Sequence, residues 1–131
     1  MTDRPTDRRY SREHEWVFTE GATALVGITD YAQEELGDIV FLSLPEIGAR
    51  VTQYGKLGEV ESVKAVSDLF APVSGEVVEV HQDLLEHPEW VNEDPFGKAW
   101  MVRVRMSDRA DLANLMTAEQ YARFLEGLEH P

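Results

Sequence analysis

The sequence predicts a mainly β fold: a small folded-over β-sandwich with one short internal helix and a helical C-terminus. Short valine-rich segments separated by glycine and proline turns recur between residues 14 and 106, which is typical of strands. Two of them, GEVESV at 58–63 and GEVVEV at 75–80, share four of six positions and flank a turn at Lys64. Beyond residue 106 the apolar residues change to helical spacing.

The predicted elements follow from local patterns. Strands are predicted at 14–18, 23–28, 38–44, 57–63, 66–70, 75–81 and 98–106. Asp30 is expected to cap a short helix through YAQEEL, which ends at Gly37 because glycine adopts positive φ without steric cost. In the last strand Val102 and Val104 alternate with Arg103, which indicates a half-buried strand. A loop over 87–98 is expected before it.

The C-terminal segment 107–128 is predicted to be helical. Ser107 is expected to cap a short turn through DRADLANL, and Thr117 with Gln120 forms a capping box for AEQYARFLEGL. An apolar stripe on this helix is expected to pack on the sheet: Tyr121, Phe124, Leu125 and Leu128. The polar residues 1–9 are predicted to be a flexible tail, and residues 10–131 a single domain.

Charge and cysteine content exclude several functions. The chain of 131 residues has 12 Lys and Arg against 25 Asp and Glu, a net charge of −13. Nucleic-acid and anionic-membrane binding need a basic face, so neither is expected as a partner. Proteins with basic patches are the favoured partners. Because cysteine is absent, the chain has no disulfide or thiolate of its own.

Lys64 is the leading candidate for a functional residue. The short step Val63-Lys64-Ala65 between two valine-rich strands predicts a tight hairpin with the lysine at its tip. A protruding lysine amine is accessible to modifying enzymes and forms stable amides with carboxylic acid cofactors. Glu59, Glu61 and Asp68 make this region acidic, so a modifying enzyme with a basic face is expected to recognise it.

No other group of residues predicts catalysis or metal binding. The histidines lack the spacing of a metal site: His14, His81, His87 and His130. No pair of carboxylates is singled out by spacing, and the chain has neither a G-x-S-x-G motif nor a phosphate-binding glycine loop. We therefore predict no catalytic residue and no metal site.

Four ordered blocks of sequence resemble a known family, the H proteins of the glycine cleavage system. The blocks are YSREHEWV (10–17), VGITDYAQEELGDIVFLSLPEIG (26–48), GEVESVKAVSDLFAPVSGEVVEV (58–80) and WVNEDPFGKAW (90–100). Together they span most of residues 10–105. The resemblance implies a barrel-sandwich hybrid of the hammerhead or lipoyl-domain type. The chain departs from the usual family pattern at His81, Trp90, Phe96 and Ala99.

The resemblance also implies roles for individual residues. It implies that Lys64 carries lipoic acid in amide linkage, and that Glu61 and Gly75 are recognised by the lipoylating enzyme. The family's cleft for the loaded lipoyl-lysine arm would correspond here to three residues: Glu15, Ile28 and Asp68.

The implied function is that of a carrier, not of an enzyme. The arm would shuttle an aminomethyl group and reducing equivalents among glycine decarboxylase (the pyridoxal-phosphate P protein), aminomethyltransferase (the T protein) and dihydrolipoyl dehydrogenase (the L protein). Lipoylating enzymes are further expected partners. The polar N-terminus favours a bacterial cytoplasm over a mature mitochondrial matrix protein.

Two alternatives to this function remain open. One is a related lipoyl carrier of another pathway, such as sulfur oxidation or lipoyl relay, and the other is an unmodified interaction module. The set of Glu61, Lys64 and Gly75 weighs against the unmodified module. Lipoyl domains of 2-oxo acid dehydrogenases are disfavoured, because they usually have Asp where this chain has Val63.

Overall fold

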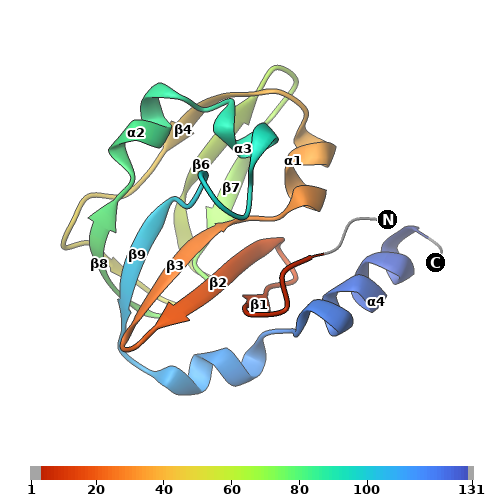
Figure 1. Cartoon of the computed structure of the whole chain (residues 1–131). Coiled ribbons are helices and arrows are strands. Elements are labelled where there is room, and N and C mark those ends of the chain that lie inside the picture. The colour runs from red at the N-terminus through yellow and green to blue at the C-terminus, as the bar shows by residue number, and fades with distance from the viewer. Residues whose placement is uncertain (1–3, 130–131) are drawn as a thin grey trace.

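Two antiparallel β-sheets form the body of the computed structural model, which describes residues 4–129 (Figure 1). The larger sheet has the strand order β1-β2-β3-β9-β8-β5, with β1 (Arg9–Tyr10), β2 (Glu15–Glu20), β3 (Thr23–Ile28), β9 (Val102–Met106), β8 (Gly75–Val80) and β5 (Arg50–Val51). The smaller sheet has the order β4-β6-β7, with β4 (Ile39–Ser43), β6 (Lys56–Ser62) and β7 (Val66–Phe70). The predicted mainly β fold is confirmed.

The core lies between the sheets, because alternate residues of each strand point inward. In β9, Val102 and Val104 are buried and Arg105 is exposed. The two similar segments fall in different sheets, and each contributes a fully buried valine, Val60 from β6 and Val77 from β8. Burial of each such side chain contributes about 1.5–3 kcal/mol to stability.

The short helix α1 (Asp30–Leu36) begins at Asp30, one residue earlier than expected, because Asp30 was predicted to be the N-cap that precedes the helix. Thr29, not Asp30, is the N-cap, and its hydroxyl accepts a hydrogen bond from the Ala32 amide. Thr29 is extended, as an N-cap must be, whereas Asp30 is already helical. Gly37 ends the helix with φ 83°, as predicted, and its amide donates to the Gln33 carbonyl.

Two further short helices lie in the chain between β8 and β9: α2 (Gln82–Glu86) and α3 (Trp90–Glu93). The sequence predicted only a loop over 87–98. Neither helix has a side-chain N-cap. Each instead buries one apolar residue completely, Leu84 or Val91, so tertiary packing stabilises turns that local propensity does not.

The C-terminal helices pack along one side of the larger sheet (Figure 1). The 3₁₀ helix η1 (Arg109–Asn114) is capped by Asp108 and not by Ser107. In α4 (Ala118–Glu129) the capping box of Thr117 and Gln120 is confirmed by reciprocal bonds of 2.9 and 3.1 Å. Tyr121 is fully buried and stacks on Tyr10 at 4.9 Å.

The N-terminal segment is not a free tail over residues 4–9; residues 1–3 lie outside the described part. Arg4 pairs with Asp30 at 2.8 Å. The Arg8 guanidinium lies 4.7 Å from the centre of the Trp16 ring and donates to the Phe96 carbonyl. These partners are remote in sequence, so the polar composition of the segment could not reveal them. Between residues 4 and 129, no helix is both long and apolar enough to span a membrane.

Candidate functional site

Lys64 lies exposed at the tip of the β6–β7 hairpin. The Ser62 side chain organises the turn: its hydroxyl accepts from the Lys64 and Ala65 amides at 3.2 and 3.1 Å. The Ser62 amide donates to the Ala65 carbonyl at 2.8 Å. Serine commonly bonds backbone groups two or three residues on, which closes turns of this kind. The hairpin tip is therefore held from within, and the lysine projects from a fixed base.

A second set of contacts holds the turn from outside. The Val63 amide donates to the carbonyl of Asp38, just beyond the end of α1, at 3.0 Å. The lysine stem lies against Gly37, where an added Cβ would stand 3.4 Å from Lys64 Cε. Asn92 from α3 ties this region together, because its side chain accepts from the Ile39 amide and donates to the Gly37 carbonyl, both at 2.9 Å.

The two predicted recognition residues differ in their surroundings. Glu61 is exposed on the outer face of β6, three residues before Lys64. Gly75 is buried at the start of β8, and an added Cβ would overlap the Arg105 carbonyl oxygen. From the Lys64 turn, β7 leads away for five residues, about 16 Å of extended chain, before the connection to Gly75. The absence of a side chain at Gly75 is thus required by the close approach of β9.

Two of the predicted arm-docking residues lie side by side. Glu15 on β2 pairs with Ile28 on β3, and both are almost fully buried. The Glu15 carboxyl accepts from the Ser11 hydroxyl at 2.6 Å and from the Phe70 amide at 3.2 Å. Burial raises the pKa of Glu15 from 4.5 to about 8. Through the Phe70 amide, the Glu15 carboxyl is bonded to β7, an edge strand of the smaller sheet.

Asp68, the third predicted docking residue, is not brought together with this pair. It is exposed on β7, opposite Glu59 in the strand register. Its carboxylate lies 3.4 Å from the ammonium of Lys56, which also pairs with Glu59 at 2.6 Å. Asp68 thus belongs to a surface ion cluster, whereas Glu15 is internal.

Two pockets lie beside the hairpin and meet at Glu13. One, of about 260 Å³, is lined by Glu13, His14, Tyr31, Ala32, Glu35, Leu36 and Ser67. The other, of about 270 Å³, is lined by Arg12, Glu13, Tyr54 and Phe70. Each includes a residue of β7, and the first reaches Leu36, the neighbour of Gly37 on which the Lys64 stem rests. Sequence reasoning missed these lining residues, which come from segments far apart in the chain.

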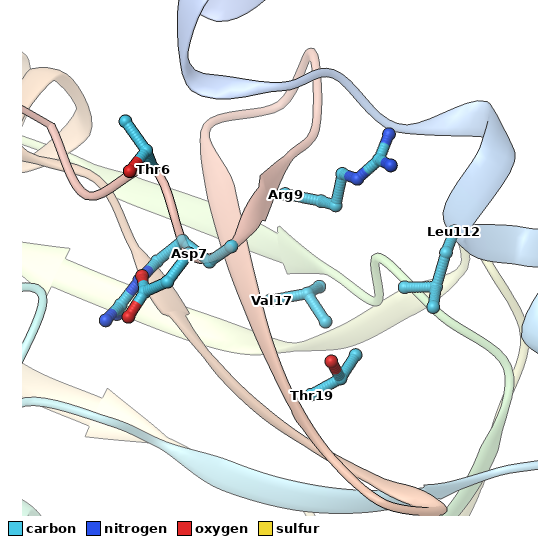
Figure 2. Close-up of a pocket in the computed structure, with 7 residues that line it drawn as sticks. Thr6, Asp7, Arg9, Val17, Thr19 and Leu112 are labelled. Atoms are coloured by element: carbon cyan, nitrogen blue, oxygen red, sulfur yellow. The ribbon is translucent and has the colours of Figure 1, made fainter.

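A third pocket, of about 340 Å³, is formed by the N-terminal segment, β2 and η1 (Figure 2). Its lining residues are Thr6, Asp7, Arg8, Arg9, Val17, Thr19 and Leu112. The Arg8 guanidinium there is already bound by Asp7 and the Phe96 carbonyl. None of the predicted site residues lines this pocket. Within residues 4–129, no three His, Cys, Asp or Glu side chains are grouped so that they could hold a metal ion.

The chain is similar to proteins of one family over nearly its whole length. A family profile described as Glycine cleavage H-protein matches residues 8–128. The glycine cleavage system H protein of Geobacillus kaustophilus is 59% identical over 117 residues, which cover 89% of this chain and 92% of that protein. The H protein of Carboxydothermus hydrogenoformans is 52% identical over 122 residues, which cover 93% and 94%.

A solved structure agrees with these sequence matches. The crystal structure of a glycine cleavage system H protein from Mycobacterium marinum matches with a TM-score of 0.85 and 41% identity, covering 93% of this chain and 98% of that one. This likeness confirms the predicted barrel-sandwich fold. The sequence matches confirm the resemblance and the prediction of a carrier component of a multienzyme system. The chain belongs to the glycine cleavage H-protein family.

Proposed function

We propose that this chain is the lipoyl carrier of a glycine cleavage system and that Lys64 bears the lipoyl group in amide linkage. The observation that carries the proposal is the exposed lysine at a hairpin tip held by Ser62 and the Asp38 carbonyl. A carrier must offer its amine to several enzymes in turn, and a rigid base with an exposed side chain meets that need.

The residues around the tip fit a lipoyl group. Lys64 takes part in none of the ion pairs among residues 4–129, so attachment of an acyl group breaks no pair there. Ala32 and Leu36 give the neighbouring pocket apolar surface for a hydrocarbon chain. The dithiolane supplies, when attached, the reversible disulfide chemistry that a chain without cysteine lacks.

The partners follow from that role. We propose exchange of the aminomethyl group and of electrons with glycine decarboxylase, aminomethyltransferase and dihydrolipoyl dehydrogenase. The net charge of −13 favours encounter with basic surfaces on these enzymes. The bacterial sources of the relatives support the predicted bacterial cytoplasm. These relatives are named as glycine cleavage system H proteins, which favours glycine cleavage over sulfur oxidation, lipoyl relay or an unmodified module.

We also propose that the loaded arm lies in the pockets along β7, and that Glu15, Ile28 and Asp68 take part in its docking. Glu15 is uncharged at neutral pH because of its raised pKa. A cationic amine brought near it would favour the carboxylate form and gain a charge-assisted hydrogen bond. Ile28, which is almost fully buried, lies beside Glu15 in the strand register, and Asp68 is exposed on β7.

The test of lipoylation is intact-mass measurement followed by peptide mapping across residues 57–80. Incubation with a lipoate–protein ligase, ATP and lipoate is expected to add one lipoyl group, confined to Lys64. The Lys64→Arg variant keeps the charge and is expected to gain none. A wild-type chain that stays unmodified under these conditions refutes the proposal and favours the interaction module. A lipoylated chain that fails to support glycine cleavage with the partner enzymes favours a carrier of another pathway.

A further inference from the structure

An exposed row of three side chains crosses the outer face of the smaller sheet beside the Lys64 turn. Phe41 on β4 lies opposite Glu61 on β6, and Glu61 lies opposite Val66 on β7. Directly opposed residues of antiparallel strands point to the same face, so the three side chains adjoin one another. With a strand spacing of about 4.8 Å, the row is about 10 Å wide. Within the row, Glu61 lies three residues before Lys64 and Val66 lies two residues after it.

The two flanking members of the row are apolar and uncovered. Phe41 is 57% exposed and Val66 is 61% exposed, whereas the next residue on β4, Leu42, is buried in the core. The core therefore makes little use of either outward-facing side chain. Exposed apolar side chains that are gathered in one place mark interaction sites more often than scattered single ones do, and these two stand on either side of Glu61.

The central member of the row is a carboxylate without a cation. In the next row toward Lys56, Glu59 and Asp68 share the ammonium of Lys56. Glu61 takes part in none of the ion pairs of the described residues. A partner surface that covered Phe41 and Val66 would also remove water from Glu61. Burial of an unpaired carboxylate is strongly unfavourable, so that surface has to supply a cation opposite Glu61.

We propose that Phe41, Glu61 and Val66 form a docking row for the enzyme that attaches the lipoyl group to Lys64. The enzyme surface that fits the row presents a basic side chain between apolar ones. An arginine suits it best, because a guanidinium binds a carboxylate through two parallel hydrogen bonds. The apolar flanks exclude water from this pair and strengthen it. The inference rests on the proposed lipoylation of Lys64 and extends recognition of the hairpin to β4.

The test compares initial rates of lipoylation of the purified full-length chain by a lipoate–protein ligase with ATP and lipoate. Phe41→Ala is expected to lower kcat/KM about tenfold, as for a central interface residue. Phe41→Leu keeps apolar surface and is expected to stay within about twofold of wild type. The matched control is Ile47→Ala, which removes a residue of similar exposure, 66%, in the connection beyond the other end of β4. That variant is expected to react at the wild-type rate.

A double-mutant cycle tests whether the row acts as a unit. Once Glu61→Gln has removed the ion pair, Phe41→Ala is expected to cost less than its tenfold effect in the wild-type background. Thermal unfolding of each variant checks that the exposed substitutions leave the fold intact. Phe41→Ala at the wild-type rate overturns the docking row, and so does an equal loss in Ile47→Ala. The docking row is also overturned if the Phe41→Ala chain is lipoylated at the normal rate but, once loaded, reacts more slowly with dihydrolipoyl dehydrogenase. Failure of the wild-type chain to be lipoylated refutes the proposed function instead.

Discussion

Replacement of Gly75 by alanine is expected to destabilise the fold without removing a contact with the lipoylating enzyme. A Cβ there would overlap the Arg105 carbonyl oxygen and lie 2.8 Å from its carbon and 2.9 Å from Val104 Cγ1. Ordinary contacts of a Cβ begin near 3.4 Å, so the strands have to separate by an appreciable fraction of an ångström or more. Gly75 pairs with Met106 of β9 and with Val51 of β5, so the shift disturbs two ladders.

The expected magnitude follows from this overlap. Overpacking against a backbone that cannot move freely costs about 3 kcal/mol. For a domain of this size, that corresponds to a fall in Tm of about 12 °C. Gly127→Ala is the matched control, because no atom outside its own stretch of helix backbone lies within 4 Å of a Cβ added there. Gly127 lies in the last turn of α4, where alanine is a better helix former than glycine and is expected to raise stability by up to about 0.5–1 kcal/mol.

The assay combines thermal unfolding with lipoylation at a temperature well below both transitions. If Gly75 acts through the fold, the folded Gly75→Ala chain is lipoylated at close to the wild-type rate, and its modification fails only as it unfolds. The reasoning is wrong if Gly75→Ala keeps the wild-type Tm. It is equally wrong if the folded variant loses lipoylation at low temperature, because the glycine would then be contacted by the enzyme.

Two further predictions concern buried polar groups. In the folded state the Glu15 carboxyl has a pKa of about 8, against an ordinary value of 4.5. The protonated carboxyl therefore contributes its full stability below pH 4.5, and this contribution is lost as the pH rises through 8. Glu15→Gln, which cannot ionise, is therefore expected to gain Tm relative to wild type between pH 5 and pH 9, and a constant difference would contradict the burial of this carboxyl. Asn92→Ala leaves the Ile39 amide and the Gly37 carbonyl without their partner. It is expected to lower the free energy of unfolding, measured in urea, by about 2 kcal/mol and to speed hydrogen exchange at the Ile39 amide. Unchanged exchange at that amide would exclude a role of Asn92 in holding the base of the hairpin.

The strands could be predicted from the sequence because their inward residues repeat with a period of two. Helix boundaries were less certain, because two adjacent polar residues can each act as a cap. Thr29 and Asp108, the residues that form the caps, each have the extended backbone that an N-cap needs, whereas Asp30 is already helical. Short helices such as α2 could not be predicted, because their stability comes from burial of residues such as Leu84 against distant strands.

Of the site, the hairpin and its lysine could be predicted, but the residues that hold them could not. Ser62 gave no signal beyond its residue type, although it makes the bonds that close the turn. Asn92 lies 28 residues after Lys64 in the sequence, so only the fold shows that it supports the same region. His81 is one of the residues that differ from the usual family pattern. It joins β8 to α2, away from the hairpin, and its ring stacks on Trp100 at 4.2 Å.

The edge of β7 explains why the lysine hairpin and the proposed arm site adjoin. An exposed edge strand offers unpaired amides to other chains, which proteins usually prevent by covering the edge. Here the Glu15 carboxyl occupies the Phe70 amide, and its burial keeps it protonated near neutral pH. The same strand contributes Ser67 to the pocket nearer Lys64 and Phe70 to the pocket at the other end of the strand. A cationic cargo that drew Glu15 into ionic contact would lower its pKa and compete with the Phe70 amide for the same carboxyl. Docking of the arm and protection of the edge would therefore be coupled through one side chain, and Glu15→Gln, which keeps an acceptor for the amide but no charge for the cargo, separates the two.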